Sequence, residues 1–279
     1  MYKITKKVYL NNTEAHITVH APFIADKAKA GQFVIVRAKE NSARIPFTVF
    51  DTNPKTGEIG IIYQIVGGGT LELDSLNQGD SLQDLVGPLG NPTEIEGIKT
   101  ACVVGGGVGC AIAYPIAKAL NAQGTKVDSV IGFRNKDLII LEDEFAAISD
   151  KLTVMTDDGS NGNKGFVTTA LEDNILNNRQ YDMVFAIGPL PMMKFVSLLT
   201  KKHNIPTTVS MNSIMIDGTG MCGGCRLTVG GEMKFACVDG PDFDGHLVDF
   251  DEAISRSSMY KESEKKSRDE ACRIFGKEL

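Results

Sequence analysis

Three of the six cysteines, Cys222, Cys225 and Cys237, lie close together in the last quarter of the chain, and Asp217 precedes them. Four residues separate Asp217 from Cys222, and two separate Cys222 from Cys225. Plant-type [2Fe–2S] sites have the spacing C-x4-C-x2-C…C, here with aspartate in the first place. The intervening glycines let a loop turn tightly and direct its N–H groups at sulfur. The segment therefore predicts a [2Fe–2S] cluster held by these four residues.

Other interpretations of the cysteine segment stay open at this point. Zinc accepts mixed thiolate and carboxylate ligands, so a zinc site would use the same residues. Three unligated buried thiols are a further alternative. Asp217 is the least certain ligand, because a carboxylate on iron is unusual and aspartate often serves as a turn residue. Cys102 and Cys272 are expected to be ordinary buried thiols.

A glycine-rich loop in the middle of the chain follows an expected strand and opens an expected helix. A helix N-terminus after such a loop can bind the pyrophosphate of a dinucleotide. The loop departs from G-x-G-x-x-G, because Cys110 stands at the third glycine. A purely structural strand-to-helix turn is the alternative. The predicted contacts are Gly105, Gly106, Gly107, Val108 and Gly109.

The ends of the next two strands bear on which dinucleotide would bind. After Phe133 no clean acidic residue is available for a ribose hydroxyl, whereas Arg134 and Lys136 offer cations for a 2′-phosphate. The residues alone thus leave NAD(H) and NADP(H) open. Asp157 and Asp158 follow a strand and precede glycine. We expect them to form a turn and ligand rim, with Asp157 at the nucleotide, and not an acid–base pair.

A second glycine loop, Gly67–Gly69, is followed by Thr70 and an expected helix over 71–76. Such a loop can hold another pyrophosphate through its N–H groups, and an upstream arginine can pair with phosphate oxygens. A proline would fix the backbone beside a flat ring, and a threonine could hydrogen-bond to it. A strand with one exposed arginine is the plainer interpretation. The predicted flavin-site residues are Arg44, Pro46, Phe47, Thr48, Ile62, Tyr63, Val66, Gly68, Gly69 and Thr70.

Composition excludes several other classes of protein. Lys and Arg number 29 against 35 Asp and Glu, a net charge of −6 that disfavours general nucleic-acid binding. A hydrophobic content of 42% excludes dominant disorder. No apolar run is long enough to span a membrane, and the N-terminus does not read as a signal peptide, so we expect a cytoplasmic protein. The four histidines lack metal-site spacing, no G-x-S-x-G elbow occurs, and no catalytic side chain is assigned.

The elements that must position these residues change along the chain. Short β patterns separated by turns over residues 1–98 predict a closed antiparallel β-barrel. Alternating strands and helices over residues 99–211 predict an α/β domain with a parallel sheet covered on both faces. Residues 212–250 form the cysteine segment. Residues 251–279 are a charged tail, expected as a solvated helix or, alternatively, as a docking element for another subunit.

Taken in order, these motifs resemble the ferredoxin–NADP reductase superfamily. Gly188-Pro189-Leu190-Pro191-Met192 is similar to the family's late Gly-Pro-x-x-Met turn near the nicotinamide, with contacts expected at Gly188, Pro189 and Met192. Ile187 stands where many members have a cysteine, so no cysteine role is expected there. The resemblance implies FAD on the barrel and NAD(H) on the α/β domain.

The cysteine segment narrows the resemblance to the branch with a C-terminal [2Fe–2S] segment. This branch includes electron-transfer subunits of dihydroorotate dehydrogenase, which carry four cysteines, and sulfide dehydrogenase β-type subunits. Asp217 in place of a cysteine, with Phe235-Ala236-Cys237-Val238-Asp239-Gly240-Pro241 downstream, looks more like the small FAD/[2Fe–2S] subunits of NADH-dependent reduced ferredoxin:NADP+ oxidoreductases.

That resemblance implies hydride exchange between NAD(H) and FAD, and single electrons passing through the cluster to a larger flavin/iron–sulfur partner subunit. Ferredoxin would be reached through the partner, in an electron-bifurcating complex. The alternatives are a dihydroorotate dehydrogenase electron-transfer subunit and a zinc-stabilised nucleotide-binding protein without redox turnover.

Overall fold

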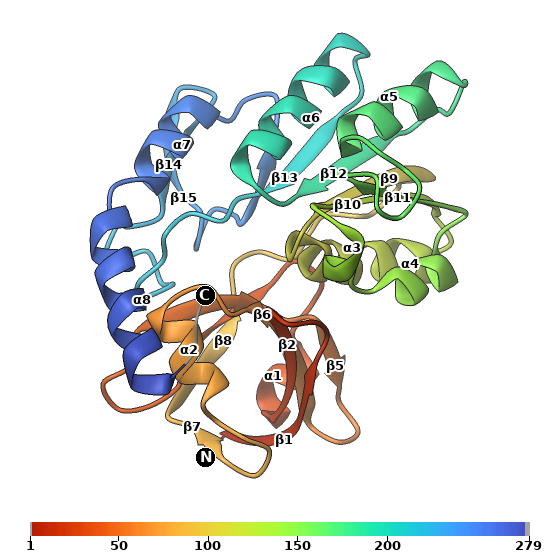
Figure 1. Ribbon diagram of the computed structural model, residues 1–279. Coiled ribbons are helices and arrows are strands. Elements are labelled where there is room, and N and C mark those ends of the chain that lie inside the picture. Colours follow the sequence, from red (N-terminus) through yellow and green to blue (C-terminus); the bar gives the residue numbers. More distant parts are fainter. Residues whose placement is uncertain (1, 277–279) are drawn as a thin grey trace.

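The computed structural model describes residues 2–276. An antiparallel β domain and an α/β domain lie side by side, and the C-terminal segment runs along both of them (Figure 1). No helix in the described part of the chain is long and apolar enough to cross a membrane.

The N-terminal domain encloses one core between a five-stranded and a three-stranded antiparallel sheet, ordered β5-β6-β2-β1-β7 and β4-β3-β8. This confirms the predicted antiparallel β fold, although in the described residues backbone hydrogen bonds form two sheets and not one closed barrel. We call the two sheets together the barrel. Along β6, Ile59, Ile61 and Tyr63 point into the barrel, whereas Ile62 packs against the α/β domain. The elements are β1 Tyr2–Tyr9, β2 Glu14–His20, α1 Pro22–Lys27, β3 Phe33–Arg37, β4 Arg44–Thr48, β5 Asp51–Asn53, β6 Glu58–Gln64, α2 Gly68–Asp74, β7 Ser81–Leu82 and β8 Asp84–Leu89.

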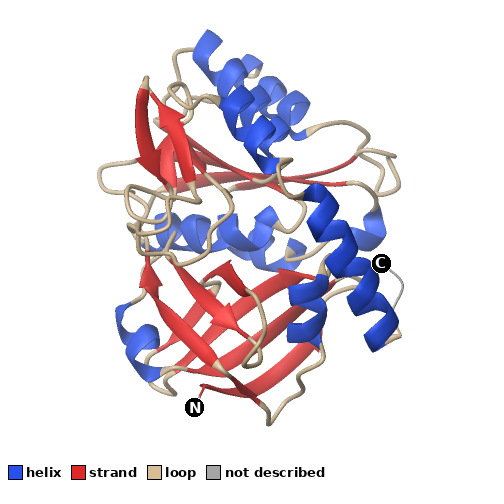
Figure 2. Ribbon diagram, turned by 90° about the vertical axis from the view of Figure 1, so that its left-hand side faces the viewer, coloured by secondary structure: helices blue, strands red, loops and turns tan. Residues whose placement is uncertain are grey.

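The second domain is the predicted parallel sheet with helices on both faces (Figure 2). Strand order is β11-β10-β9-β12-β13-β16, where β16 is Asp242–Asp244, so the chain leaves β9 toward β10 on one side and later returns to β12 on the other. Ligands bind at the carboxyl ends of strands where the order reverses in this way. The elements are β9 Thr100–Gly106, α3 Gly109–Ala122, β10 Lys126–Phe133, η1 Lys136–Leu138, α4 Glu142–Ile148, β11 Lys151–Thr156, α5 Val167–Leu176, β12 Met183–Ile187, α6 Leu190–Lys202 and β13 Thr207–Ser210.

The sequence pattern predicts a helix over residues 164–171, but helix α5 begins only at Val167 and extends to Leu176. The preceding loop contains Gly159, Gly162 and Gly165, all with positive φ. A chain that repeatedly adopts left-handed backbone cannot continue into a right-handed helix, so the loop stays open up to Phe166.

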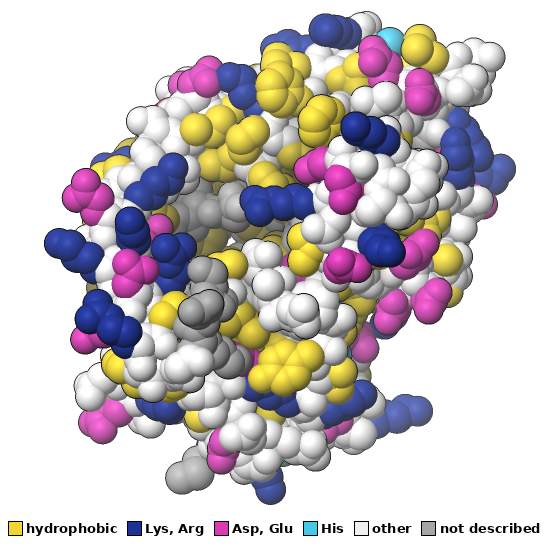
Figure 3. Space-filling model, in the orientation of Figure 1, with side chains coloured by type: hydrophobic (Ala, Val, Ile, Leu, Met, Phe, Trp, Pro, Cys, Tyr) yellow, Lys and Arg dark blue, Asp and Glu magenta, His cyan; other side chains and the backbone are white. Residues whose placement is uncertain are grey.

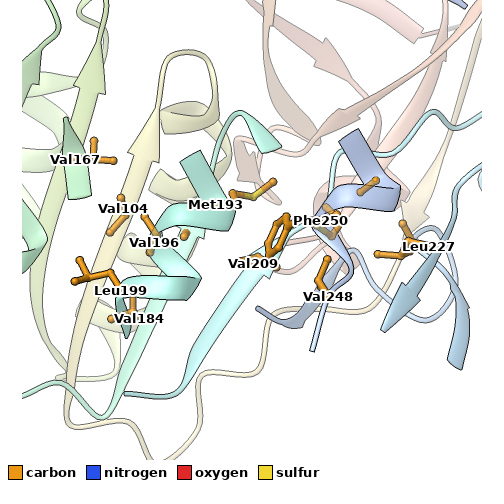
Figure 4. Packing of buried hydrophobic residues seen from close by; sticks show 14 of the residues in the cluster. Val104, Val167, Val184, Met193, Val196, Leu199, Val209, Leu227, Val248 and Phe250 are labelled. Carbon is orange, nitrogen blue, oxygen red and sulfur yellow. The ribbon is translucent and has the colours of Figure 1, made fainter. Parts of the chain in front are cut away.

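The cysteine segment shares its core with the α/β domain. It contains the hairpin β14 Arg226–Val229 and β15 Glu232–Phe235, and then β16 Asp242–Asp244, which pairs antiparallel with β13. Leu227 and Phe250 belong to the same buried cluster as Met193 and Val209 (Figure 4). The segment therefore packs as an extension of the α/β sheet.

The charged tail forms α7 Phe250–Ser257 and α8 Lys261–Phe275, and α8 packs against α2 (Figure 1). Ala271 is buried, and Cys272 and Phe275 pack on the barrel core. The expectation of a simply solvated helix was therefore wrong for its last turns. A four-residue spacing between Ala271 and Phe275 gives an otherwise polar helix one narrow apolar stripe.

A buried ion pair fixes α2 on the barrel. The Lys7 ammonium lies 2.9 Å from the Asp74 carboxylate, with side-chain exposures of 7% and 1%. Lys7 also donates to the carbonyl oxygen of Leu76 at 3.0 Å, and the Tyr63 hydroxyl donates to Asp74 at 3.3 Å. Because these contacts hold the end of α2, they also position the glycine loop at its start.

We expect Asp74→Ala to lower the free energy of unfolding by about 3–5 kcal/mol, because it leaves the Lys7 ammonium buried without its counterion. Urea unfolding followed by circular dichroism measures this. Asp26→Ala is the matched control, since Asp26 pairs with Lys27 in an exposed contact and should change stability by less than about 1 kcal/mol. Equal small losses in both variants would show that the buried pair does not stabilise α2.

Candidate functional site

A cavity of about 1140 Å³ lies between the barrel and the α/β domain. Figure 3 shows the molecule hollowed between the two domains, with hydrophobic side chains gathered over α6 above the hollow. Most of the predicted nucleotide contacts meet in its wall, together with one residue of the predicted flavin set. They are Val66, Gly106, Gly107, Val108, Gly109, Arg134, Asp157, Gly188, Pro189 and Met192.

The two nucleotide motifs touch each other at the point where the strand order reverses. A Cβ added at Gly109 would lie 2.7 Å from the Cα of Gly188, and one at Gly106 would collide with Met192 and Pro189. Gly107 has φ +54°, which favours glycine. Glycine is thus required here by backbone packing, and the turn lines the cavity at the start of α3.

The residues that follow β10 and β11 form the far rim of the cavity. Arg134 and Asp157 line it, and the Asp157 N–H donates to the Phe133 carbonyl at 3.0 Å. Asp158 instead accepts the Ser160 N–H at 2.9 Å, and hydrogen bonds from Ser160 lower the pKa of the Asp158 carboxyl. The neighbouring carboxylates therefore have separate surroundings, in keeping with a turn and a rim.

The predicted flavin residues lie together on the barrel, along β4, β6 and the start of α2. Arg44 is exposed, and a Cβ added at Gly69 would lie 2.6 Å from the Ile45 side chain, so the glycine loop packs on β4. The Thr70 hydroxyl oxygen accepts the N–H groups of Val66 and Gly67, each at 3.0 Å. Thr70 thus shapes the loop itself.

Two members of this set have buried side chains that a ligand on the barrel surface could not contact. Tyr63 is 1% exposed inside the barrel, where burial raises the pKa of its hydroxyl, and Ile62 is buried between the domains. Their side chains therefore serve packing. Phe47 is half-buried, and its ring packs against the barrel core with its centroid 5.9 Å from that of Tyr63. The groups available to a ligand are Arg44, the side chains of Pro46 and Thr48, and the backbone of Gly68 and Gly69.

The cysteine loop supplies sulfur atoms and N–H donors of the kind that an iron–sulfur cluster needs. The Cys225 and Cys237 sulfurs lie 3.3 Å apart, and burial and Cys225 raise the pKa of the Cys237 thiol to about 12. The Cys237 N–H is directed at the Cys225 sulfur and the Gly224 N–H at the Cys222 sulfur, each at 3.4 Å. Such N–H groups stabilise cluster thiolates, so these cysteines fit the predicted group.

Asp217 has a different position in this loop. Its carboxylate accepts the Thr219 N–H at 2.5 Å and the Cys222 N–H at 2.8 Å, and these bonds lower the pKa of the carboxyl. The described residues contain no group of three or more His, Cys, Asp or Glu side chains close enough to hold a metal. Asp217 thus closes a turn that precedes Cys222, and ligation of iron would require it to exchange these bonds.

The cysteine loop is attached to the barrel. Gly218 has φ +77°, and a Cβ there would lie 2.8 Å from the Leu89 side chain at the end of β8. Asn91 donates its N–H to the Gly240 carbonyl at 2.7 Å and its amide group to the Val238 carbonyl at 3.0 Å. The cysteines are therefore fixed with respect to the barrel that carries the predicted flavin residues.

The sequence pattern did not identify some residues of the cavity wall. Glu14 and Gln64 face each other across β2 and β6, and Phe166 and Phe195 are 66% and 60% exposed at α5 and α6. A polar residue at a strand end is usually solvated, and a phenylalanine in an amphipathic segment is usually buried. No motif distinguishes these four from such residues.

An antiparallel barrel, a parallel sheet with glycine turns at its switch point and a cysteine loop between them define a class: pyridine-nucleotide oxidoreductases with the ferredoxin reductase-like fold. Within that class, the chain belongs to the family of dihydroorotate dehydrogenase B electron-transfer subunits and their homologues.

The comparisons with known proteins carry this assignment. Residues 212–249 match the iron–sulfur cluster binding domain of dihydroorotate dehydrogenase B, and residues 103–198 match an oxidoreductase NAD-binding domain. A Thermotoga maritima protein named as a homologue of the dihydroorotate dehydrogenase B electron transfer subunit is 47% identical over 98% of this chain and 96% of its own. The electron transfer subunit of Bacillus caldolyticus is 36% identical over 81% of this chain and 89% of its own.

A solved structure gives the same fold. A chain of the NADH-dependent reduced ferredoxin-NADP oxidoreductase, described for its insights into flavin-based electron bifurcation, has TM-score 0.92 and 47% identity over 97% of both chains. The family matches confirm the predicted iron–sulfur segment and NAD-binding domain, and this flavoprotein neighbour supports FAD as the third cofactor.

The two roles of Asp217 can be separated by substitution. If Asp217 ligates iron, Asp217→Cys should keep a [2Fe–2S] signal with a shifted potential, while Asp217→Asn and Asp217→Ala should lose or weaken it and keep FAD. If Asp217 only closes the turn, Asn should suffice, because its oxygen accepts the same N–H bonds, and Cys should not. EPR and iron analysis of the reduced protein decide. Cys222→Ser should abolish the normal signal, and Cys272→Ser should leave it unchanged.

Proposed function

We propose that this chain is the small FAD/[2Fe–2S] subunit of an electron-bifurcating NADH-dependent reduced ferredoxin:NADP+ oxidoreductase. The observation that carries the proposal is the end-to-end likeness to a chain of that enzyme, at 47% identity and TM-score 0.92. The aspartate at the first position of the cysteine spacing supports it, because a fourth cysteine is absent there. A cytoplasmic location belongs to the same proposal.

Each group of residues has a separate task in this proposal. Arg44 and the Gly68–Thr70 loop hold the FAD pyrophosphate, while the backbone and side chains from Pro46 to Thr48 lie along the flavin ring. The Gly105–Gly109 loop holds the dinucleotide pyrophosphate through N–H groups at the start of α3, with Arg134 and Asp157 at the adenosine end. Gly188, Pro189 and Met192 place the nicotinamide.

When bound, FAD exchanges hydride with the nicotinamide and the cluster carries electrons singly, which is the chemistry these cofactors supply. The chain itself orients the cofactors and excludes water from them. Contacts between Gly109 and Gly188 fix the nicotinamide side of the cleft, and the Asn91 hydrogen bonds fix the cysteine loop against the barrel. Both electron-carrying sites are thereby held on one rigid frame.

The electrons must leave to a partner subunit, which we propose to be a larger flavin/iron–sulfur oxidoreductase subunit that passes them on to ferredoxin. The surface beside the cysteine loop suits a subunit contact, since Met221 and Ile216 are 89% and 53% exposed. Neither nucleic acid nor a membrane belongs to this proposal.

A second candidate is the electron-transfer subunit of a dihydroorotate dehydrogenase. The match of residues 212–249 to the cluster-binding domain of that enzyme favours it.

The identity of the partner subunit distinguishes the two candidates. The native assembly is co-purified and then analysed by mass spectrometry and for its cofactors. Under the first proposal, we expect to recover a larger flavin/iron–sulfur subunit of the bifurcating type. Recovery of a dihydroorotate-oxidising subunit supports the second candidate, and a colourless zinc-containing protein contradicts both.

We expect NADH to reduce the flavin of the purified complex faster than NADPH does. Arg134 lies at the cavity rim, where its guanidinium could bind a 2′-phosphate. Arg134→Ala should therefore slow flavin reduction by NADPH more than flavin reduction by NADH. Stopped-flow absorbance measures both rates. A faster reaction of the wild type with NADPH would contradict the assignment of NADH.

Arg44→Ala should weaken FAD binding by about 1.5–3 kcal/mol, because it removes a charge-assisted contact to the pyrophosphate. Gel filtration followed by flavin quantitation measures retention, and titration of the flavin-free protein gives the affinity. Lys55→Ala, in the exposed turn before β6, is the control. Unchanged flavin affinity in the arginine variant would remove Arg44 from the site.

A further inference from the structure

Glu14 is a buried acid in the wall of the nucleotide cavity. It is the first residue of β2, is only 2% exposed, and lines the cavity together with Gly107 and Val108 of the nucleotide loop. The strand register places it opposite Gln64, which lines the same cavity. The barrel thus presents one carboxyl group to the ligand cleft at the point where the α/β domain presents the start of α3.

The surroundings of Glu14 provide hydrogen bonds but no countercharge. The Asn11 side-chain amide donates to its Oε2 at 2.7 Å, and Asn11 in turn accepts the Glu14 N–H at 2.9 Å. Among the described residues, Glu14 forms no ion pair. From α3, the titratable group that interacts with it is the Cys110 thiol. The charged side chains elsewhere in the cavity wall are Arg134, Asp157, Glu172 and Lys202.

These surroundings favour the neutral acid. Burial raises the pKa of the Glu14 carboxyl, and the hydrogen bond from Asn11 opposes this only in part. A neutral carboxylic acid has an O–H to donate, whereas the carboxylate can only accept. A dinucleotide is anionic at its pyrophosphate, so a carboxylate in this low-dielectric cleft would repel it.

We propose that Glu14 is a ligand-binding residue of the cleft: its protonated carboxyl donates a hydrogen bond to a bound dinucleotide, and its ionised form opposes binding. Because the acid must be neutral in the complex, dinucleotide binding takes up a proton whenever free Glu14 is ionised. No bond is made or broken in this step. The inference rests on the proposed function, in which this cleft holds NAD(H).

Isothermal titration of the flavin-loaded full-length protein with NAD+ tests the inference. Repeating the titration in buffers of different ionisation enthalpy, from about pH 6 to about pH 9, gives the protons bound per NAD+. The wild type should take up protons, approaching one per NAD+ at high pH, and lose affinity by up to roughly tenfold per pH unit above the pKa of Glu14.

Glu14→Gln should bind NAD+ without this proton uptake and without this loss of affinity, because the amide stays a neutral donor. Glu58→Gln, at the half-buried start of β6 and outside the cavity wall, is the matched control and should behave as the wild type. Flavin content and circular dichroism verify that each variant is folded. Unchanged proton uptake in Glu14→Gln, or none in the wild type, would overturn the assignment to Glu14. Absence of NAD+ binding by the wild type at every pH would overturn the proposed function as well.

Discussion

The arrangement of the whole molecule depends on how residues 237–244 are held between the two domains. Strand β16 pairs with β13 and so belongs to the α/β sheet, while the Thr93 hydroxyl at the end of the barrel donates to the Asp242 carboxylate at 2.5 Å. Burial raises the pKa of Asp242. The short segment after Cys237 is therefore attached to both domains at once, and the cysteine loop cannot move relative to either without breaking buried contacts.

This constraint matters because electron transfer depends on fixed distances, whereas dinucleotide exchange needs an accessible cleft. The structure separates the two requirements. The cysteine loop is packed on β8 through Gly218 and bonded to Asn91, but the cavity wall carries exposed side chains such as Phe166 and Phe195. Exposed side chains therefore line the rim of the nucleotide cavity. The cysteine segment, in contrast, packs against the buried cluster that includes Val209 and Phe250.

Sequence patterns predicted the elements whose signals are local. Alternation in β2, the continuous apolar run of β3 and the strand–glycine–helix order at Gly105–Gly109 are such local signals of side-chain period and turn chemistry. The packing of helix α8 was harder to predict from sequence, because its apolar stripe is narrow and its contact with α2 is visible only in the tertiary structure. Tyr63 belongs to the predicted flavin-site residues, but strand alternation turns its side chain into the barrel. Glu14 gave no signal, since its burial depends on a strand and a helix distant in sequence.

Asp217 shows why spacing alone leaves a ligand set undecided. The same short side chain that fits the first position of the cysteine spacing also fits a turn, and the structure shows it accepting two backbone N–H groups. Those bonds hold the carboxyl group ionised and place it on the loop that carries Cys222. A cysteine at this position could not accept two such bonds with similar strength, because sulfur is a weak acceptor. An aspartate therefore folds the loop by itself and keeps an anionic oxygen on the backbone N–H of Cys222. The two roles are thus compatible in sequence and differ only in which atoms the oxygens contact.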